Sequence, residues 1–184
     1  MGHLLRLDHV FGDDRRCRLV SLLSIEDPAW ARSDVLGHTG HGPGTRQLPP
    51  ASGRYHSPQM TTLRSVMASV CYSATKGLFD LPLPGHLDTQ VFGVHMTGTP
   101  VDPPRQGPHV DNRDGVPPLV TAVYYADVQD VDGGQIAVGR GVLRHLLTLM
   151  TDTLIAFPGD TTHEVLAVRA GHRLSVVCNF YALT

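Results

Sequence analysis

One segment of the chain repeats apolar residues with the period of an α-helix. The apolar positions lie three and four residues apart, at Met60, Leu63, Val66, Met67, Val70, Cys71 and Ala74. Ser57 stands where its side chain can cap the first turn, and Pro58 suits the first helical position. Gly77 is placed to end the helix. The pattern therefore predicts one amphipathic helix ahead of the second half of the chain.

The second half of the chain has the patterns of short β-strands separated by Gly, Pro or Asp. Strands are predicted near residues 90–97, 119–127, 134–138, 153–157, 163–168 and 172–181. A helical or irregular stretch is expected at residues 140–150. Several short strands at such spacing are typical of a sandwich or barrel. We therefore predict a mainly β fold with flanking helices, built as a double-stranded β-helix, that is, a jelly-roll, cupin-like barrel.

The first third of the chain has weaker patterns. Residues 16–25 are interpreted as a strand, and residues 27–36 as a turn followed by a short helix. Residues 37–58 are rich in Gly, Pro, Ser and His, which predicts a loop. A loop of that length in a compact domain is usually functional or mobile. Within one domain of 184 residues, we expect residues 1–89 to support a jelly-roll core at residues 90–184.

Composition narrows the class of protein. The formal net charge is −2, which gives no electrostatic reason to expect binding to nucleic acid or to a membrane surface. No apolar run is long enough to span a bilayer, and no secretory signal is visible at the N-terminus. The three cysteines are odd in number and have no metal-binding spacing, which indicates reduced thiols in a cytoplasmic protein. The oligomeric state is left open.

Two predicted strands carry polar residues on one face. Alternation places together Arg173, Ser175, Val177, Asn179 and Tyr181 in one strand, and Thr121, Val123 and Tyr125 in the other. In one interpretation these faces look at water, as one face of an antiparallel sheet often does. In the other interpretation they line a barrel cavity that holds a polar ligand.

A motif just before one of these strands favours the interpretation in which the polar faces line a cavity. His109 and Asp111 stand two residues apart, so in an extended segment both side chains point the same way. His163 follows a Pro-Gly turn and begins a predicted strand. Two histidines and one carboxylate are the ligand set of non-haem Fe(II) oxygenases. Ten residues later, Arg173 offers a fork that can hold the far carboxylate of 2-oxoglutarate, and Ser175 can add a hydroxyl donor.

Over residues 90–181 the chain resembles the Fe(II)/2-oxoglutarate-dependent dioxygenases, in particular the prolyl hydroxylase-like branch that includes the hypoxia-inducible-factor prolyl hydroxylases. The resemblance is carried by "HVDN", "VTAVYYAD", "DGGQIAV", "HEV" and the arginine that follows. It implies that His109, Asp111 and His163 bind iron and that Arg173 binds the distal carboxylate of 2-oxoglutarate. The implied cofactors are Fe(II), the cosubstrate 2-oxoglutarate and O2.

The resemblance also implies roles for flanking residues and a reaction. Tyr125 falls at the tyrosine that donates to the same carboxylate, and Thr121 matches a position beside the cosubstrate. The implied reaction hydroxylates an unactivated C–H bond and releases succinate and CO2. Desaturation, epoxidation and cyclisation use the same residues, and the sequence does not separate them.

Departures from the family pattern bear on the substrate. Asn179 stands where those enzymes have a tryptophan, and Met96 or His95 stands where they have a tyrosine. With Arg105 and Asn112, these residues are the candidates for the substrate pocket. Residues 37–58 and 99–108 are expected where they could form a lid, which suits a substrate that must be enclosed. We therefore expect a small molecule, such as an amino acid derivative or a natural-product intermediate.

Three alternatives stay open. The motifs that carry the resemblance also support a prolyl hydroxylase that acts on a peptide or protein. A cupin-type binding protein would use the same barrel without oxygen chemistry, but it would not need Arg173 as a deep carboxylate anchor. A non-catalytic barrel that serves as an interaction module is disfavoured by the intact set of metal ligands.

Overall fold

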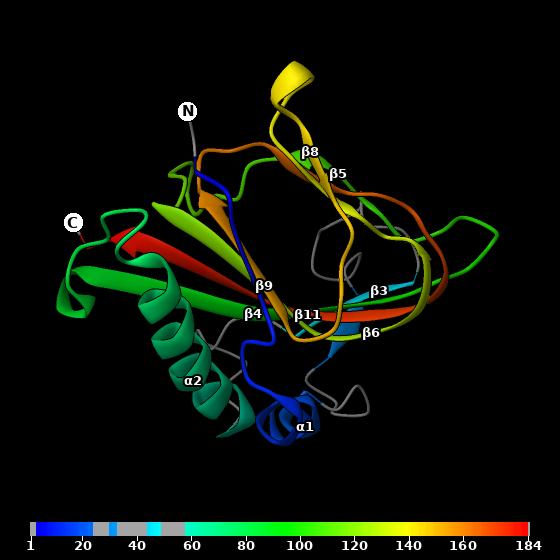
Figure 1. Ribbon diagram of the computed structural model, residues 1–184, viewed down its shortest axis with the longest axis horizontal. Helices are drawn as coiled ribbons and strands as arrows, with labels where there is room; N and C mark the ends of the chain where they lie inside the picture. Colours follow the sequence, from blue (N-terminus) through cyan, green and yellow to red (C-terminus); the bar gives the residue numbers. More distant parts are fainter. Residues whose placement is uncertain (1–2, 24–29, 33–43, 49–57, 184) are drawn as a thin grey trace.

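The computed structural model describes residues 3–23, 30–32, 44–48 and 58–183. Two antiparallel sheets face each other, and helices α1 and α2 lie on the outer side of the larger sheet (Figure 1). This arrangement confirms the predicted fold, a mainly β jelly roll with flanking helices.

The larger sheet has seven strands and the smaller sheet has four. Across the larger sheet the strands are β1 (Leu5–Asp8), β9 (Thr153–Pro158), β6 (Val120–Gly133), β11 (Val168–Ala182), β4 (Leu87–Thr97), β3 (Thr45–Leu48) and β2 (Ala31–Arg32). Across the smaller sheet they are β5 (Gln106–His109), β10 (His163–Val165), β7 (Ile136–Val138) and β8 (His145–Leu147). The strands β4, β6, β7, β9, β10 and β11 confirm the six predicted ones.

Helix α2 (Pro58–Thr75) confirms the predicted amphipathic helix. It begins at Pro58 as expected and ends two residues before Gly77, whereas Ser57 lies outside the described residues. Leu63, Met67 and Cys71, each one turn apart, are fully buried against the larger sheet. Burial of this apolar stripe is what stabilises a helix of ordinary propensity.

The prediction of a strand at residues 16–25 is wrong, because helix α1 spans Asp13–Leu22. Two aspartates in its first turn favour the helix N-terminus through the helix dipole. Leu19 and Leu23, four residues apart, are buried in the core that α1 shares with α2 and the larger sheet. A short apolar run fits both a strand and a helix, and here the packing of every fourth residue decides.

Strands also occur in segments that were predicted to be non-strand. β2 lies within the helix predicted at residues 27–36, and β3 lies within the loop predicted at residues 37–58. β3 pairs with β4 on one side and β2 on the other, so hydrogen bonding within the sheet overrides a composition typical of loops. Most other residues of these two segments, including most of the candidate lid, lie outside the described residues. Residues 140–150 hold a short 3-10 turn and β8.

The larger sheet separates two apolar cores. On its outer face, Leu174, Val176, Cys178 and Phe180 of β11 pack with the two helices. On its inner face, Val177 packs with residues of the smaller sheet. Because side chains alternate along a strand, the polar residues of β11 lie on the face of Val177, between the sheets. The interpretation in which this face looks at water is therefore wrong.

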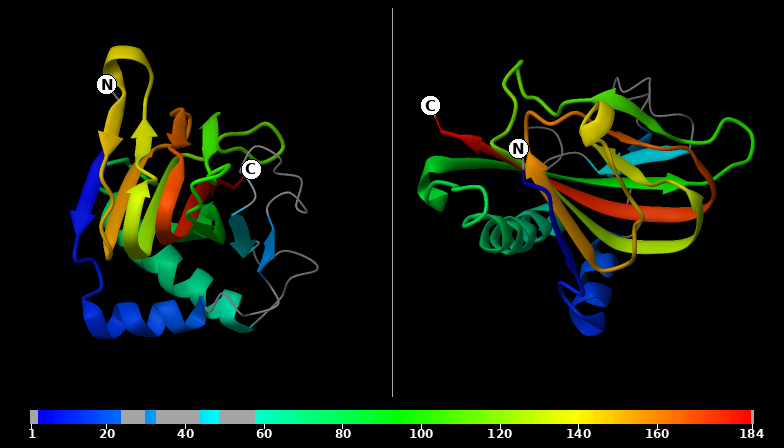
Figure 2. Two further views of the ribbon diagram at one scale, coloured as in Figure 1. Left: turned by 90° about the vertical axis from the view of Figure 1, so that its right-hand side faces the viewer. Right: turned by 45° about the horizontal axis from the view of Figure 1, so that its top comes forward.

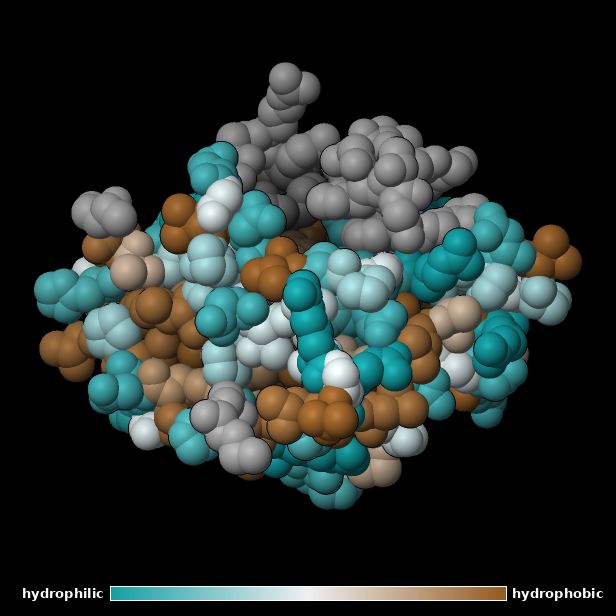
Figure 3. All heavy atoms as spheres, turned by 90° about the horizontal axis from the view of Figure 1, so that it is seen from above, coloured by the Kyte–Doolittle hydropathy of each residue, from teal (hydrophilic) through white to brown (hydrophobic). Residues whose placement is uncertain are grey.

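Some apolar side chains stay in contact with water. β7 and β8 form a hairpin that projects from the body of the molecule, and Val142 near its tip is fully exposed (Figure 2). Seen from above, apolar side chains gather at the left of the view and in a band along its lower centre, with polar side chains around them (Figure 3). None of the helices among the described residues combines the length and apolar character that crossing a bilayer requires.

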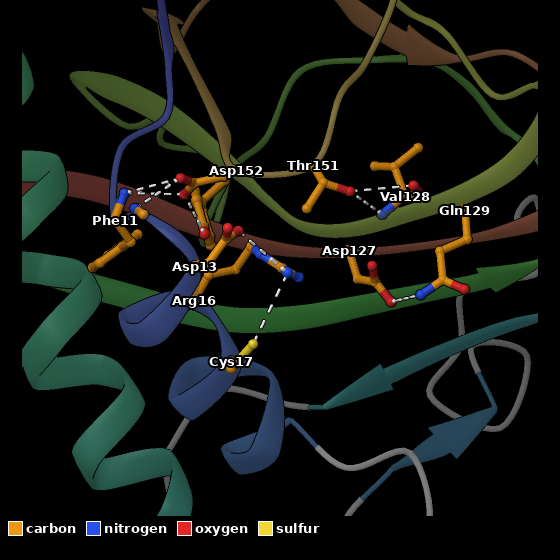
Figure 4. A network of polar contacts seen from close by, with 11 residues as sticks. Phe11, Asp13, Arg16, Cys17, Asp127, Val128, Gln129, Thr151 and Asp152 are labelled. Atoms are coloured by element: carbon orange, nitrogen blue, oxygen red, sulfur yellow. Dashed lines mark hydrogen bonds and ion pairs between the residues drawn. The ribbon is translucent and has the colours of Figure 1, made fainter.

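A buried carboxylate ties α1 to the larger sheet. Asp152 accepts hydrogen bonds from the backbone N–H of Phe11 at 3.0 Å and of Gly12 at 2.9 Å, just before the helix (Figure 4). It also accepts one from the hydroxyl of Tyr124 in β6 at 2.8 Å. Asp152 is 5% exposed, so these donors have little access to water as a substitute partner.

We predict that Asp152→Ala lowers the free energy of unfolding by roughly 2–4 kcal/mol, because two backbone N–H groups and a buried hydroxyl lose their acceptor. Tyr124→Phe removes only one of these bonds and should cost about 1 kcal/mol. Chemical denaturation of both variants measures the difference. Equal losses in the two variants would contradict the role given to Asp152.

Candidate metal centre

The structure brings together the three residues predicted to bind a metal. His109 ends β5 and lies directly opposite His163, which begins β10. Asp111 follows β5 by two residues. One ligand atom from each of the three lies within 4.8 Å of the others. Among the described residues, this is the one such group of histidine, cysteine and carboxylate ligands.

Asp111 turns one oxygen toward the histidines and the other toward the larger sheet. Its Oδ1 lies 3.5 Å from Nε2 of His109 and 3.8 Å from Nε2 of His163. Its Oδ2 accepts a hydrogen bond from Nδ2 of Asn179 at 3.1 Å and a longer one from Oγ1 of Thr121 at 3.5 Å. The three potential ligand atoms therefore face a common point.

The backbone sets the tautomer of both histidines. Nδ1 of His109 lies 2.8 Å from the carbonyl oxygen of Gly107, and Nδ1 of His163 lies 3.2 Å from that of Thr161. A carbonyl oxygen only accepts, so each Nδ1 carries the proton and each Nε2 keeps its lone pair. A neutral imidazole with this free lone pair is the form that binds metals.

Gln106 is a site residue that the sequence did not reveal. Its Nε2 lies 2.9 Å from Nε2 of His109, and its side chain lines the pocket beside the triad. A metal at Nε2 of His109 would replace this hydrogen bond. No motif marks Gln106, since a glutamine before Gly-Pro reads as part of a turn.

The charges of the triad suit a cation. Burial alone would raise the pKa of Asp111, but its contacts with His109 and His163 hold that pKa below its usual value, so the side chain is a carboxylate. Burial opposes protonation of His109 as well, yet its contacts with Asp111 raise its pKa. Burial lowers the pKa of His163. The site therefore carries a carboxylate charge that a bound cation would neutralise.

A second polar group lies deep between the sheets. Arg173 is 2% exposed, and its Nη1 donates to the carbonyl oxygen of Gly134 at 2.8 Å. Its Cζ lies 5.0 Å from the ring centroid of Tyr125. Nε of Arg173 and the hydroxyl of Tyr125 are buried and have no hydrogen-bond partner among the described residues. No salt bridge to Arg173 is present within the described part of the chain.

This deep group is an incomplete anion site. Burial lowers the pKa of Arg173 and raises the pKa of Tyr125, so the tyrosine remains a hydroxyl donor. A buried guanidinium without a carboxylate is costly unless a ligand supplies the negative charge. Ser175 lines the same pocket, but its hydroxyl donates to the carbonyl oxygen of Val94 at 3.3 Å.

One pocket joins the triad to the deep arginine. Its lining is Phe92, Val94, Gln106, His109, Asp111, Val123, Ile136, His163, Val165, Arg173, Ser175 and Val177. The residues come from both sheets, so the pocket lies inside the jelly roll. A ligand that reaches from the metal ligands to Arg173 would be enclosed largely by apolar side chains.

The structure distributes the other candidate residues differently. Met96 is fully buried opposite Arg173 but does not line the pocket. His95 lies on the outer face of the larger sheet, where it contacts Trp30 and His172. Its distance from the pocket follows from strand alternation, because Phe92 and Val94 of the same strand face inward. The structure thus does not bring His95 to the metal centre.

The remaining candidates lie at the surface. The side chains of Arg105 and Asn112 are exposed, and Asn112 bonds to the backbone of its own turn. The candidate lid at residues 99–108 is held at the start of β11, where the N–H of Thr99 donates to Val168 and that of Val168 to Pro104. One residue of this segment, Gln106, lines the pocket beside the triad, and the lid itself stays a prediction.

Comparison with known proteins shows the same fold in solved structures. No family model matches the chain, and no curated protein matches it in sequence. A 2OG-Fe(II) oxygenase family protein from Burkholderia pseudomallei is 16% identical, with a TM-score of 0.74, over 97% of this chain and 84% of that one.

Two further structures share the fold. A prolyl hydroxylase from Trichoplax adhaerens, in complex with a hypoxia-inducible-factor peptide, is 15% identical with a TM-score of 0.72, over 97% of this chain and 83% of that one. The non-haem α-ketoglutarate-dependent epimerase SnoN from nogalamycin biosynthesis is 15% identical with a TM-score of 0.71, over 100% of this chain and 80% of that one. The chain therefore has the fold of the 2-oxoglutarate- and iron-dependent oxygenases.

We predict that the triad binds a divalent metal and that Asp111→Ala weakens binding on the order of 100-fold or more, because the carboxylate ligand is lost. Titration of the metal-free protein with Co(II) measures the affinity. His95→Ala is the matched control, because it removes a histidine from the opposite face of the sheet. If Asp111→Ala and His95→Ala bind Co(II) equally well, the ligand assignment is wrong.

Proposed function

We propose that the protein is an Fe(II)- and 2-oxoglutarate-dependent dioxygenase that oxidises a C–H bond of its substrate. The proposal rests on one observation: a single pocket holds both a set of metal ligands and a buried cation that needs an anion. Two histidines and a carboxylate stand at one end, and at the other stands a buried guanidinium that has no carboxylate partner in the described part of the chain.

The hydrogen-bond donors at the deep end of the pocket suit the distal carboxylate of 2-oxoglutarate. A dicarboxylate with one end at the triad would bring its second carboxylate toward Arg173 and Tyr125. Their Nε and hydroxyl find no partner in the described residues 3–23, 30–32, 44–48 and 58–183. Charge-assisted bonds to a guanidinium are the strong class of hydrogen bond, and a phenol adds a neutral donor. A cupin-type protein that binds a neutral ligand would leave this charge unpaired.

The residues of the chain have separate tasks in this proposal. His109, Asp111 and His163 would hold Fe(II), and Arg173 with Tyr125 would hold the distal carboxylate of 2-oxoglutarate. When bound, the metal and cosubstrate supply the O2-dependent oxidation that yields succinate and CO2. The apolar side chains of the lining would limit the access of water to the pocket, which would protect the oxidation from side reactions.

We further propose a small polar molecule as the substrate. Next to Asp111, Arg113 stacks over the ring of Tyr181 at 4.3 Å and forms a salt bridge with Asp88. The hydroxyl of Tyr181 bonds to Gln90 at 3.4 Å. Hydrogen-bonding groups held in fixed positions suit a compact ligand with polar substituents. SnoN acts within the biosynthesis of a natural product, nogalamycin, which supports this class.

A prolyl hydroxylase that acts on a peptide is the second candidate. It is favoured by the HVDN and VYY motifs and by the similarity to the Trichoplax adhaerens enzyme, whose structure contains a peptide. The two candidates share the metal and cosubstrate residues and differ only in what the metal end of the pocket accepts.

For the cosubstrate, we predict that Arg173→Gln weakens binding of 2-oxoglutarate to the Co(II)-loaded protein by about 10–100-fold, because a charge-assisted bond is worth about 1.5–3 kcal/mol. Tyr125→Phe should weaken it by several-fold. Calorimetric titration gives both affinities, and Co(II) affinity should stay at the parent value in each variant. Parent-like 2-oxoglutarate affinity in both variants would refute the cosubstrate site.

For the substrate, incubation with Fe(II), 2-oxoglutarate and O2 should form succinate above background with a member of a panel of amino acid derivatives and natural-product intermediates. Mass spectrometry of the consumed compound should show gain of one oxygen or loss of two hydrogens. The comparison set is proline-containing peptides. Turnover of a peptide, without turnover of any small molecule, would replace the first candidate by the second.

A further inference from the structure

The three metal ligands are not positioned by equivalent parts of the fold. His109 and His163 lie on paired strands, so the sheet register places them opposite each other. Asp111 lies beyond the end of β5, in a segment without regular secondary structure. Strand pairing therefore does not orient its carboxylate, and side-chain contacts must do so.

Asn179 supplies the shorter of these contacts. It lies near the end of β11, between Thr121 of β6 and Gln90 of β4 in the sheet register, and it is 1% exposed. A residue flanked on both sides by paired strands has little freedom to move. Its Nδ2 donates to Oδ2 of Asp111 at 3.1 Å, whereas the bond from Thr121 measures 3.5 Å.

The orientation of the amide follows from its partner. A carboxylate oxygen only accepts hydrogen bonds, so the NH2 group of Asn179 must face Asp111. Within the residues that the structure describes, the amide oxygen of Asn179 is then left buried without a partner. The fold tolerates this unpaired acceptor, which indicates that the contact with Asp111 decides the orientation of the side chain.

We propose that Asn179 is a positioning residue that holds Oδ2 of Asp111 away from the metal, so that Oδ1 alone faces the two histidines. This inference rests on the proposed metal centre and goes beyond it. A carboxylate anchored through one oxygen offers the other as a single ligand. A facial set of three ligand atoms keeps the remaining coordination positions open for the cosubstrate and O2. The sequence analysis listed Asn179 as a candidate for the substrate pocket, and the structure adds its contact with a metal ligand.

The experiment measures Co(II) affinity by competition with a chelator, together with the visible spectrum of the bound Co(II). Asn179→Leu keeps a similar volume and removes both polar atoms. It should weaken Co(II) binding by about 10–100-fold, as loss of a partner that orients a ligand does. The spectrum should change as well, because a freed carboxylate can bind through both oxygens. Thr121→Val should have a smaller effect, because its bond is longer.

Ser175→Ala is the matched control for metal binding. Ser175 lies on the same strand and the same face as Asn179, but its hydroxyl bonds to a backbone carbonyl rather than to a metal ligand. The variant should bind Co(II) with the affinity and spectrum of the parent. Thermal unfolding of the metal-free variants checks that they fold, and Asn179→Ala replaces Asn179→Leu if the larger side chain prevents folding.

The outcomes separate this inference from the proposed function. If the parent binds Co(II) and the folded Asn179 variant binds it within about threefold with an unchanged spectrum, Asn179 does not position the ligand while the metal centre stands. If the parent binds no Co(II), the metal centre and the role of Asn179 both fail. Weaker binding with a changed spectrum, seen for Asn179 and not for Ser175, supports the inference.

Discussion

Strand β11 imposes the constraint on which the rest of the structure depends. It pairs with β4 on one side and β6 on the other over most of its length, so its two faces cannot exchange. Its outer face packs against the helices, and its inner face carries Arg173, Ser175 and Asn179 into the space between the sheets. A shift of one residue in the register would bury the apolar face of β11 in the pocket and turn these polar side chains toward the helices.

The buried charge of Arg173 on this face has a cost that no carboxylate among the described residues offsets. A jelly roll without a ligand would be more stable with apolar residues there, since a buried charge needs a partner. The negative charge of Asp111 lies at one end of the pocket and the positive charge of Arg173 at the other, and neither neutralises the other directly. A metal cation would neutralise the charge of Asp111, and a ligand carboxylate would neutralise the charge of Arg173. The two charges therefore favour a metal together with a carboxylate ligand over a single neutral ligand.

The sequence was enough to predict the features of the site that follow from residue type and local spacing. His109 and Asp111 share a direction in any extended segment, and strand alternation placed Arg173 and Tyr125 on faces that could meet. Features that depend on register or on tertiary contacts could not be predicted. Alternation alone left open which face of β4 His95 occupies. Gln106 has no motif, because its role depends on where the fold places His109. Helix α1 was mistaken for a strand because the short apolar run in its C-terminal half fits both periods until its packing partner is known.

The central claim is that one pocket binds Fe(II) and 2-oxoglutarate together. The most direct measurement is the visible spectrum of the protein under anaerobic conditions, recorded after Fe(II) alone, after 2-oxoglutarate alone and after both. A cosubstrate that chelates the bound iron gives a weak charge-transfer band, so the account predicts a band that appears only when both are present and that is lost in Asp111→Ala. A spectrum with no such band, under conditions in which binding of both components is established separately, would contradict the account.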